Sequence, residues 1–282
     1  MAKIASMNSI VLLGVPWDAS SSGQRGAAEA PAVIRQALWA ASSNAYNERG
    51  DDIAAPGVFE DAGDIDLPVG PPEARTAIEE RIRNIVHEGR RPLVLGGDHS
   101  ITYPVLRGFA GRAEPPAVLH LDAHGDLYDE FPLRREGEGE PGDRYSHACP
   151  FARVMEERLA TRLIQVGVRT LNTHQRAQAA KFGVEVLGAD RWRDAIPQIA
   201  RLRGALYVSL DLDVLEPMLA PGISHPEPGG LTVREVLEIL AAVRVPVIGA
   251  DVVEYNPRND IRDLTARVAA KFVKELIGVM RR

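Results

Sequence analysis

The 282-residue sequence predicts a three-layer α/β fold built around a mostly parallel sheet. Two observations support this fold class. Short apolar stretches with strand character alternate with helical patterns along the chain, and no long linker or internal repeat interrupts them. Such alternation is typical of βαβ units, whose helices cover both faces of a parallel sheet. We therefore expect one domain over residues 1–282, a length at which α/β folds are often single units.

Eight segments are predicted to be strands. They are residues 9–14, 57–60, 92–95, 117–121, 162–166, 184–187, 205–210 and 245–250. Helical patterns fall between and after them, at residues 30–43, 73–88, 101–109, 149–160, 174–182, 193–201, 232–243 and 262–280. The helix at 232–243 has a clear start, because Thr232 can act as its N-cap and Glu235 can complete a capping box.

Bulk composition argues against nucleic acid and membrane partners. The net charge of −6 and the pI near 5.7 leave no basic surface for phosphates. The N-terminal apolar stretch is short and lacks the features of a signal peptide, and no apolar run is long enough to span a bilayer. The single cysteine, Cys149, excludes an intramolecular disulfide, and we expect it to pack rather than to react. These features predict a cytoplasmic protein.

Polar residues that can bind metal follow three of the predicted strands. They are His99 in GGDHS; Asp122, His124 and Asp126 in LHLDAHGD; and Asp211 and Asp213 in SLDLD. Because parallel strands all point the same way, residues just past their carboxyl ends gather at one edge of the sheet, where open α/β sheets bind ligands. The sequence therefore brings four carboxylates and two imidazoles together.

A metal site explains this gathering better than the alternatives. A lone Asp-x-Asp after a strand is usually a turn or a helix cap, and a lone histidine is usually a core residue, but three such runs coincide here. The four aspartates carry four negative charges, which two divalent ions would neutralise. The mixed oxygen and nitrogen ligands suit Mn²⁺, and Zn²⁺, Co²⁺ or Fe²⁺ are chemically possible. His120 and Asp98 flank these residues and are expected to support ligands rather than to bind metal.

Several longer motifs resemble the ureohydrolase family, which comprises arginases, agmatinases, guanidinobutyrases and formimidoylglutamases. They are GGDHS, DAHGD, YSHACPFARVMEE, SLDLDVLEPMLAPG and DVVEYNP, and the similarity runs from GVPWDASSSGQRGAAEAPAVIR to the last helix. Within the family the chain is most similar to plant-type arginases, through PGISHPEPGGLTVREVL, GADVVEYNPRND and TARVAAKFVKEL. The resemblance implies an α/β/α fold with an eight-stranded parallel sheet, two Mn²⁺ per subunit, and a homotrimer or homohexamer.

The resemblance also implies how the ligands divide between the two ions. One ion would be bound by His99, Asp122, Asp126 and Asp211, and the other by His124, Asp122, Asp211 and Asp213. Asp122 and Asp211 would then bridge the ions, and water activated between them would attack the substrate. Asp126 would accept a hydrogen bond from that water and is a candidate catalytic residue.

Three further residues are candidates for substrate binding. Glu254, in DVVEYNP, follows another predicted strand and is not needed as a ligand, so its carboxylate can bind a guanidinium. The alternative is a surface or capping glutamate. By resemblance, His147 in YSHACPF would move protons at the reaction centre, although a lone loop histidine is usually inert. His225 in GISHPEPGG stands where the wider family usually has threonine. We predict that Glu254, His147 and His225 contact substrate and that Glu254 and His147 are also catalytic.

The identity of the substrate is less constrained. Animal-type arginases recognise the α-amino and α-carboxylate groups with an asparagine after the DAHxD run and with an acidic residue after a later strand. Here Leu127 and Tyr128 follow DAHGD, and Asn172 stands where that acidic residue would be. L-arginine is the first choice, because the plant-type resemblance is extended, with agmatine second and another guanidino acid third. A formimidoyl or other amidine hydrolase and a non-catalytic metal-binding protein are the rivals. The charged, Gly- and Pro-rich segment 132–143 is predicted to border the site. Its Arg134 and Arg135 and the nearby Arg144 could meet a substrate carboxylate, but we expect them to be surface charges.

Overall fold

The strands of the chain form one eight-stranded parallel sheet. The computed structural model describes residues 9–131 and 142–282. The strand order is β2-β1-β3-β8-β7-β4-β5-β6, and every pair of neighbouring strands is parallel. The strands are β1 (Ile10–Gly14), β2 (Phe59–Asp64), β3 (Arg91–Leu95), β4 (Ala117–Leu121), β5 (Arg162–Val168), β6 (Glu185–Gly188), β7 (Leu206–Asp211) and β8 (Val247–Val253). The predicted fold class is confirmed, and the prediction of one domain stays a prediction.

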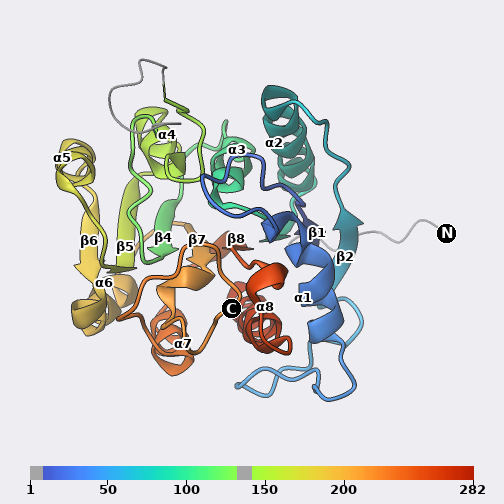
Figure 1. Cartoon of the computed structure of the whole chain (residues 1–282). Helices are drawn as coiled ribbons and strands as arrows, with labels where there is room; N and C mark the ends of the chain where they lie inside the picture. Colours follow the sequence, from blue (N-terminus) through green and yellow to red (C-terminus); the bar gives the residue numbers. More distant parts are fainter. Residues whose placement is uncertain (1–8, 132–141) are drawn as a thin grey trace.

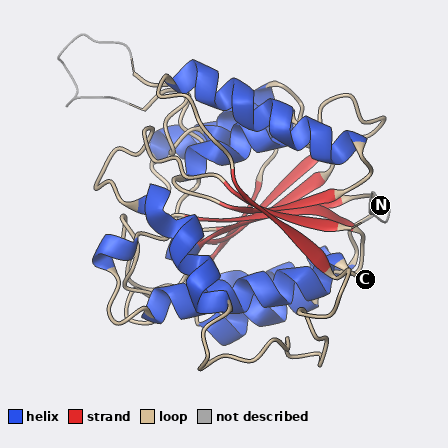
Figure 2. Ribbon diagram, turned by 90° about the vertical axis from the view of Figure 1, so that its right-hand side faces the viewer, coloured by secondary structure: helices blue, strands red, loops and turns tan. Residues whose placement is uncertain are grey.

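Helices cover both faces of this sheet, which gives three layers (Figure 2). They are α1 (Ala30–Leu38), α2 (Pro71–His87), α3 (Thr102–Arg107), α4 (Pro150–Glu156), α5 (Thr173–Phe182), α6 (Ala195–Ala200), α7 (Val233–Ala241) and α8 (Leu264–Met280). Short 3₁₀ turns are η1 (Ala27–Glu29), η2 (His99–Ile101), η3 (Ala189–Asp194), η4 (Leu212–Val214) and η5 (Pro257–Asn259). In Figure 1, α2 to α5 lie on one side of the sheet and α1, α6, α7 and α8 on the other.

The alternation of side chains along the strands produces two separate hydrophobic cores. In β1, Ile10 and Leu12 pack with α1 and α8, whereas Val11 and Leu13 face the opposite layer, with α2 and α3. Successive residues of a strand point to opposite faces, so a strand buried on both faces must be apolar at every position. The continuous apolar run IVLLG in β1 is therefore a consequence of its place inside the sheet.

The predicted elements all occur, and their ends differ where the sequence signal is local and polar. The edge strand β2 runs to Asp64, beyond the predicted end at residue 60. The prediction ended too early because the largely exposed FEDAGD sequence lacks the apolar run of a central strand. The helix predicted at 30–43 ends at Leu38. Beyond it, the Asn44 side chain accepts a hydrogen bond from the backbone of Tyr46, which competes with helix continuation.

Two local predictions can be compared with side-chain contacts. The capping box of α7 is confirmed: Thr232 Oγ1 accepts from the Glu235 backbone N–H at 3.2 Å, and the Glu235 carboxylate accepts from the Thr232 N–H at 2.8 Å. Cys149 is buried with its thiol free, as expected for a packing residue. Within residues 9–131 and 142–282, none of the helices has the length and apolar character needed to cross a membrane.

The order of the central strands places four carboxyl ends next to one another. After β3 the chain crosses to β4, and β8 and β7 later fill the space between them. The four adjacent strands β3, β8, β7 and β4 are parallel, so the residues that follow them lie along one edge of the sheet. The predicted metal-binding runs follow β3, β4 and β7, and Glu254 follows β8.

Candidate metal and substrate site

The turn after β3 fixes the position of His99. Gly97 lies so close to the preceding loop that a Cβ there would be 1.7 Å from the Trp17 carbonyl oxygen, which only glycine allows. Asp98 then caps η2 by accepting from the Ser100 N–H at 3.1 Å, and its other oxygen accepts from the Ser20 N–H at 2.9 Å. Burial, with the nearby charge of Glu254, raises the pKa of Asp98 to about 7. Asp98 therefore supports the His99 turn, as expected.

Three carboxylate oxygens surround the Nδ1 atom of His99. Oδ2 of Asp122, Asp126 and Asp211 lie 3.2, 3.1 and 3.0 Å from it. His99 is fully buried, and no hydrogen bond satisfies its Nδ1 atom within the described part of the chain. Donor atoms that share one small divalent ion, at about 2.0–2.2 Å each, must lie about 3 Å apart. These four residues therefore fit a metal ion.

The other ring nitrogen of His99 is held by a buried polar chain. Nε2 lies 2.9 Å from Ser209 Oγ, and that hydroxyl donates to Asp251 at 2.7 Å. Tyr207 and Thr102 donate to the second oxygen of Asp251 at 2.7 and 2.9 Å. With Ser209 donating to Asp251, its oxygen accepts the Nε2 proton of His99, which leaves the Nδ1 lone pair directed at the three carboxylates.

A second set of ligand atoms lies beside the first and shares Asp122 with it. His124 Nδ1 is 2.7 Å from Asp213 Oδ2 and 3.5 Å from Asp122 Oδ1. Asp122 thus turns one oxygen to each set, as a bridging ligand would. Asp211 offers Oδ2 to His99, and its Oδ1 accepts from the Asp213 N–H at 2.8 Å. The geometry gives Asp122 the two-sided position of a bridge, and the bridging role of Asp211 stays a prediction.

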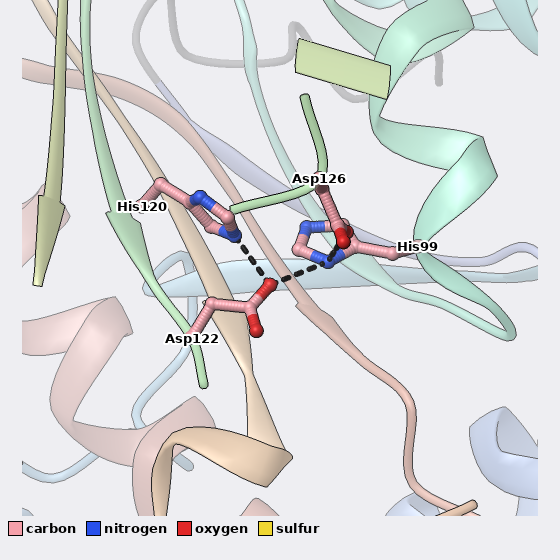
Figure 3. Close-up of side chains that lie close together, drawn as sticks. All are labelled: His99, His120, Asp122 and Asp126. Atoms are coloured by element: carbon pink, nitrogen blue, oxygen red, sulfur yellow. Dashed lines mark hydrogen bonds and ion pairs between the residues drawn. The ribbon is translucent and has the colours of Figure 1, made fainter. Parts of the chain in front are cut away.

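His120 contacts Asp122, one of the ligands of the first set (Figure 3). Its Nε2 lies 2.6 Å from Asp122 Oδ2, and its Nδ1 accepts from the Gln165 amide at 3.0 Å. Burial lowers the pKa of His120, so it is neutral with its proton on Nε2. A ring that donates to Asp122 in this way can support the ligand, although His120 also lies within reach of the possible ligand atoms of His99, Asp122 and Asp126. Its supporting role stays a prediction.

The charges of this cluster are not balanced by the protein alone. Burial and the neighbouring Asp213 and Asp122 raise the pKa of Asp211 well above its usual range. Burial and Asp122 likewise raise the pKa of Asp213 to about 7. Burial opposes the charge of His99, but the carboxylates around it outweigh burial and raise its pKa. Four buried carboxylates in one place are costly unless cations accompany them, and this set accordingly suits divalent metal.

Glu254 and His147 form a second buried pair beside the cluster. Oε1 of Glu254 accepts from the His99 backbone N–H at 2.8 Å and lies 3.2 Å from His147 Nδ1. Burial opposes ionisation of Glu254, but His147 overcomes it and lowers the Glu254 pKa to about 2. Burial likewise opposes protonation of His147, and Glu254 raises the His147 pKa to about 9. The two side chains are therefore an ion pair at neutral pH.

One oxygen of Glu254 is left available. Oε2 is buried and has no hydrogen-bond partner among the described residues, although His225 Nδ1 lies 4.0 Å away. Glu254 has a φ of 62° and Asp126 a φ of 48°, a left-handed conformation that costs non-glycine residues energy and is common at functional sites. The backbone strain and the unpaired oxygen both indicate that Glu254 is positioned to bind a ligand.

Seven of the nine predicted site residues line one cavity of about 230 Å³, and the other two, His99 and Asp122, do not line it. Its wall contains His124, Asp126, Asp211, Asp213, His147, His225 and Glu254, together with Ser22, Tyr128, Phe131, Ala148, Thr170 and Gln175. Sequence reasoning did not single out Ser22, whose hydroxyl lies 2.8 Å from His147 Nε2. It also missed Arg169, which donates to the Asp213 and Glu227 carbonyls and holds the loop after β7. Neither residue stands in a motif whose chemistry points to a site.

Other residues that the sequence suggested lie at the edge of the cavity or outside the described residues. Arg144 pairs with Asp129 and Glu156 at 3.0 and 3.1 Å, which makes it a surface charge as predicted. Asn172 caps α5 and donates to the Tyr128 hydroxyl at 2.7 Å. The predicted border loop, with Arg134 and Arg135, falls on residues 132–141, which lie outside the described part.

A parallel α/β fold with a His–Asp cluster beside a polar cavity fits a metal-dependent hydrolase. The family model described as the arginase family matches residues 8–278, and the chain belongs to this family. As a member of it, the chain is a ureohydrolase with a binuclear metal centre. The predicted family is thereby confirmed.

Individual relatives agree with this assignment. The chain is 44% identical to "Arginase 1, mitochondrial" of Arabidopsis thaliana, with 94% of this chain and 79% of that protein aligned. It is 32% identical to the agmatinase of Bacillus anthracis, over 95% of this chain and 90% of the relative. The solved structure of the arginase from Medicago truncatula superposes with a TM-score of 0.87 at 40% identity, covering 97% of this chain and 88% of that one.

The expectation of a cytoplasmic location is wrong by these comparisons. The arginases of Arabidopsis thaliana, rice and Medicago truncatula that match the chain are named mitochondrial. The expectation was based on a single cysteine and on the absence of a secretory signal pattern. Both features describe any reducing compartment and do not distinguish the cytoplasm from the interior of an organelle.

Proposed function

We propose that this protein hydrolyses L-arginine to L-ornithine and urea with two Mn²⁺ ions per subunit. The observation that carries the proposal is the unpartnered Oε2 of Glu254, a buried anionic acceptor in a cavity that also contains the metal-binding cluster. A guanidinium is a cation with several N–H donors, and a carboxylate is its natural partner. The identity to plant arginases over nearly the whole chain supports arginine as the substrate.

Six residues would hold the two metal ions. His99, Asp122, Asp126 and Asp211 surround one position, and His124, Asp213 and the shared Asp122 and Asp211 the other. When bound, the ions would supply Lewis acidity and lower the pKa of a coordinated water. Carboxylate oxygens mixed with imidazole nitrogens favour Mn²⁺ over the softer ions that prefer sulfur.

The protein side chains would bind the substrate and move its protons. Glu254, fixed through its backbone and through Oε1, would hold the guanidinium by Oε2 and place the carbon of that group beside the metal cluster. His147 is a cation at neutral pH and would donate a proton to the departing amine nitrogen. Asp126 faces both the cluster and the cavity and would accept a proton from the attacking water. His225 would line the cavity beside His147.

The preferred experiment measures urea released by Mn²⁺-loaded protein from arginine, agmatine, guanidinobutyrate and guanidinopropionate. We expect arginine to give the highest kcat/KM. A higher value for agmatine would make the protein an agmatinase, and formamide in place of urea from a formimidoyl substrate would identify an amidine hydrolase. Full metal loading with no product from any substrate would reduce the protein to a metal-binding scaffold. Light scattering on the same sample tests the proposed homotrimer or homohexamer.

A further inference from the structure

Three side chains at the mouth of the cavity form a separate group of possible metal ligands. One ligand atom from each of His147, His225 and Glu254 lies within 4.8 Å of the other two. The two imidazole rings are 4.6 Å apart, and the Glu254 carboxylate lies 3.2 Å from Nδ1 of His147 and 4.0 Å from Nδ1 of His225. Two histidines and one glutamate with an open fourth position are a ligand set that binds Zn²⁺ in proteins.

We propose that His147, His225 and Glu254 bind an inhibitory Zn²⁺ ion, separate from the two-metal cluster, that competes with the guanidinium for Glu254. The inhibition rests on the function proposed above, whereas the binding of the ion does not. None of these three residues is among the six proposed ligands of the cluster, so the group would add a third ion.

One oxygen of Glu254 is free for such an ion, and the other oxygen is paired with His147. Glu254 is only 3% exposed, and its Oε2 has no hydrogen-bond partner in the described structure. His147 lies 2.8 Å from the Ser22 hydroxyl through Nε2. Nδ1 of His147 carries the proton of the ion pair with Glu254, and zinc would displace that proton while Nε2 keeps its own proton against the Ser22 hydroxyl.

The backbone around the group limits how far the ligands can move. His147 donates its backbone N–H to the Ser20 carbonyl at 3.1 Å, and the Glu254 N–H bonds to the Gly97 carbonyl at 2.9 Å. A Cβ on Gly23 would lie 2.6 Å from Nε2 of His225, so the glycine makes room for that ring beside His147. Because tetrahedral ligands of Zn²⁺ are separated by about 3.3 Å, only a small approach of His225 completes the set.

The electrostatic surroundings tolerate a third cation. The four cluster aspartates offset the charge of two divalent ions, so a third ion meets a cluster that is near neutral overall. Zinc, which prefers nitrogen ligands more than Mn²⁺ does, is the ion that this set selects.

The test counts metals before it measures activity. Mn²⁺-loaded protein is dialysed against Zn²⁺ with Mn²⁺ in excess, and both metals are measured per chain by mass spectrometry. We expect two manganese ions to be retained and one zinc ion to be gained. His225→Asn should lose the zinc ion and keep both manganese ions, while the matched control His87→Asn, on the exposed end of α2, should bind all three. Co²⁺ in place of Zn²⁺ should give the visible absorption of a tetrahedral site.

Kinetics then test the consequence. Zn²⁺ should inhibit urea release competitively with arginine. The zinc concentration that halves the uninhibited rate of each protein should be at least about tenfold higher for His225→Asn than for wild type. Zinc uptake matched by manganese loss, or equal zinc uptake by wild type and His225→Asn, would overturn the proposal. If His225→Asn retains fewer than two manganese ions, His225→Gln is measured by the same criteria. Three bound metals without urea release would refute only the proposed function, and urea release without a third metal only the zinc site.

Discussion

The carboxylate cluster and the mouth of the cavity are built in different ways. The cluster, comprising His99, Asp122, His124, Asp126, Asp211 and Asp213, follows directly after three buried parallel strands. The mouth, comprising Ser22, Tyr128, Phe131, His147 and His225, is assembled from loops that are far apart in the sequence. Residues on strand ends are held by the sheet, and loop residues depend on contacts with other loops.

This difference separates chemistry from recognition. Five of the six cluster residues are buried, and the sixth, His124, has a side chain that is 25% exposed. The cluster residues contact one another, so a change in one disturbs its neighbours. In the mouth, the side chains of His147 and His225 are 11% and 25% exposed. The partners of His147, which include Ser22 and Phe131, come from other loops. Glu254 lies between the two regions, since it follows strand β8 but turns its free oxygen into the cavity. Variants of the two regions should therefore fail in different ways.

The largest effect is expected within the cluster, from Asp122→Asn. The change removes the negative charge that both ligand sets share, so at least one metal ion should be lost. Metal polarisation is worth several kcal/mol, and we expect kcat/KM for arginine to fall at least about a thousandfold. Metal content after Mn²⁺ loading and urea release are measured together. The control is Asp194→Asn, whose exposed carboxylate pairs with Arg191. Two retained ions with full activity would show that Asp122 is not a ligand.

The second prediction separates the cluster from the mouth through Glu254→Gln. The substitution is nearly isosteric, and Glu254 is not among the proposed ligands, so both metal ions should remain. It removes the charge that pairs with the guanidinium, and we expect at least about a hundredfold loss of kcat/KM, since a charged hydrogen bond contributes about 1.5–3 kcal/mol and this one also aligns the substrate. The control is Glu60→Gln, an exposed residue of β2 that pairs with Arg90. Loss of a metal ion would make Glu254 a ligand instead.

Sequence reasoning predicted the cluster because its information is local. Each ligand stands within a few residues of a strand end, and the direction of parallel strands brings those ends together. The same logic located the eight strands and the capping box of α7. It could locate Glu254 because that residue also follows a strand.

The mouth could not be predicted in the same way. The contact between Ser22 and His147 joins residues 125 apart in the chain. Ser22 stands in a stretch that resembles the family, but nothing there shows which of its serines meets His147. Arg169 is bonded to backbone carbonyls, which carry no sequence signal. The division of the two oxygens of Asp122 between two ligand sets is likewise a matter of side-chain orientation, which follows from packing and not from spacing.

The last prediction concerns the pH dependence of stability at the mouth, where the smallest effect is expected. Glu254 raises the pKa of His147 from 6.5 to about 9, so the folded metal-free protein holds this proton more tightly than the unfolded chain. The stabilisation is therefore fully present below pH 6.5 and is lost as the pH rises through about 9. Within that window the free energy of unfolding should fall by up to about 1.4 kcal/mol per pH unit because of this group.

Urea denaturation of metal-free protein across that pH range measures this slope. His147→Gln removes the titrating ring, and the slope of the variant should be smaller than that of wild type by the contribution of His147. His87→Gln, a substitution of an exposed histidine distant from the cavity, should keep the wild-type slope. Metal content after reloading should be unchanged in both variants, because neither residue is a proposed ligand of the two-metal cluster. Identical slopes for wild type and His147→Gln would mean that His147 and Glu254 do not form an ion pair, and the proton donor assigned to the mouth would have to be sought elsewhere.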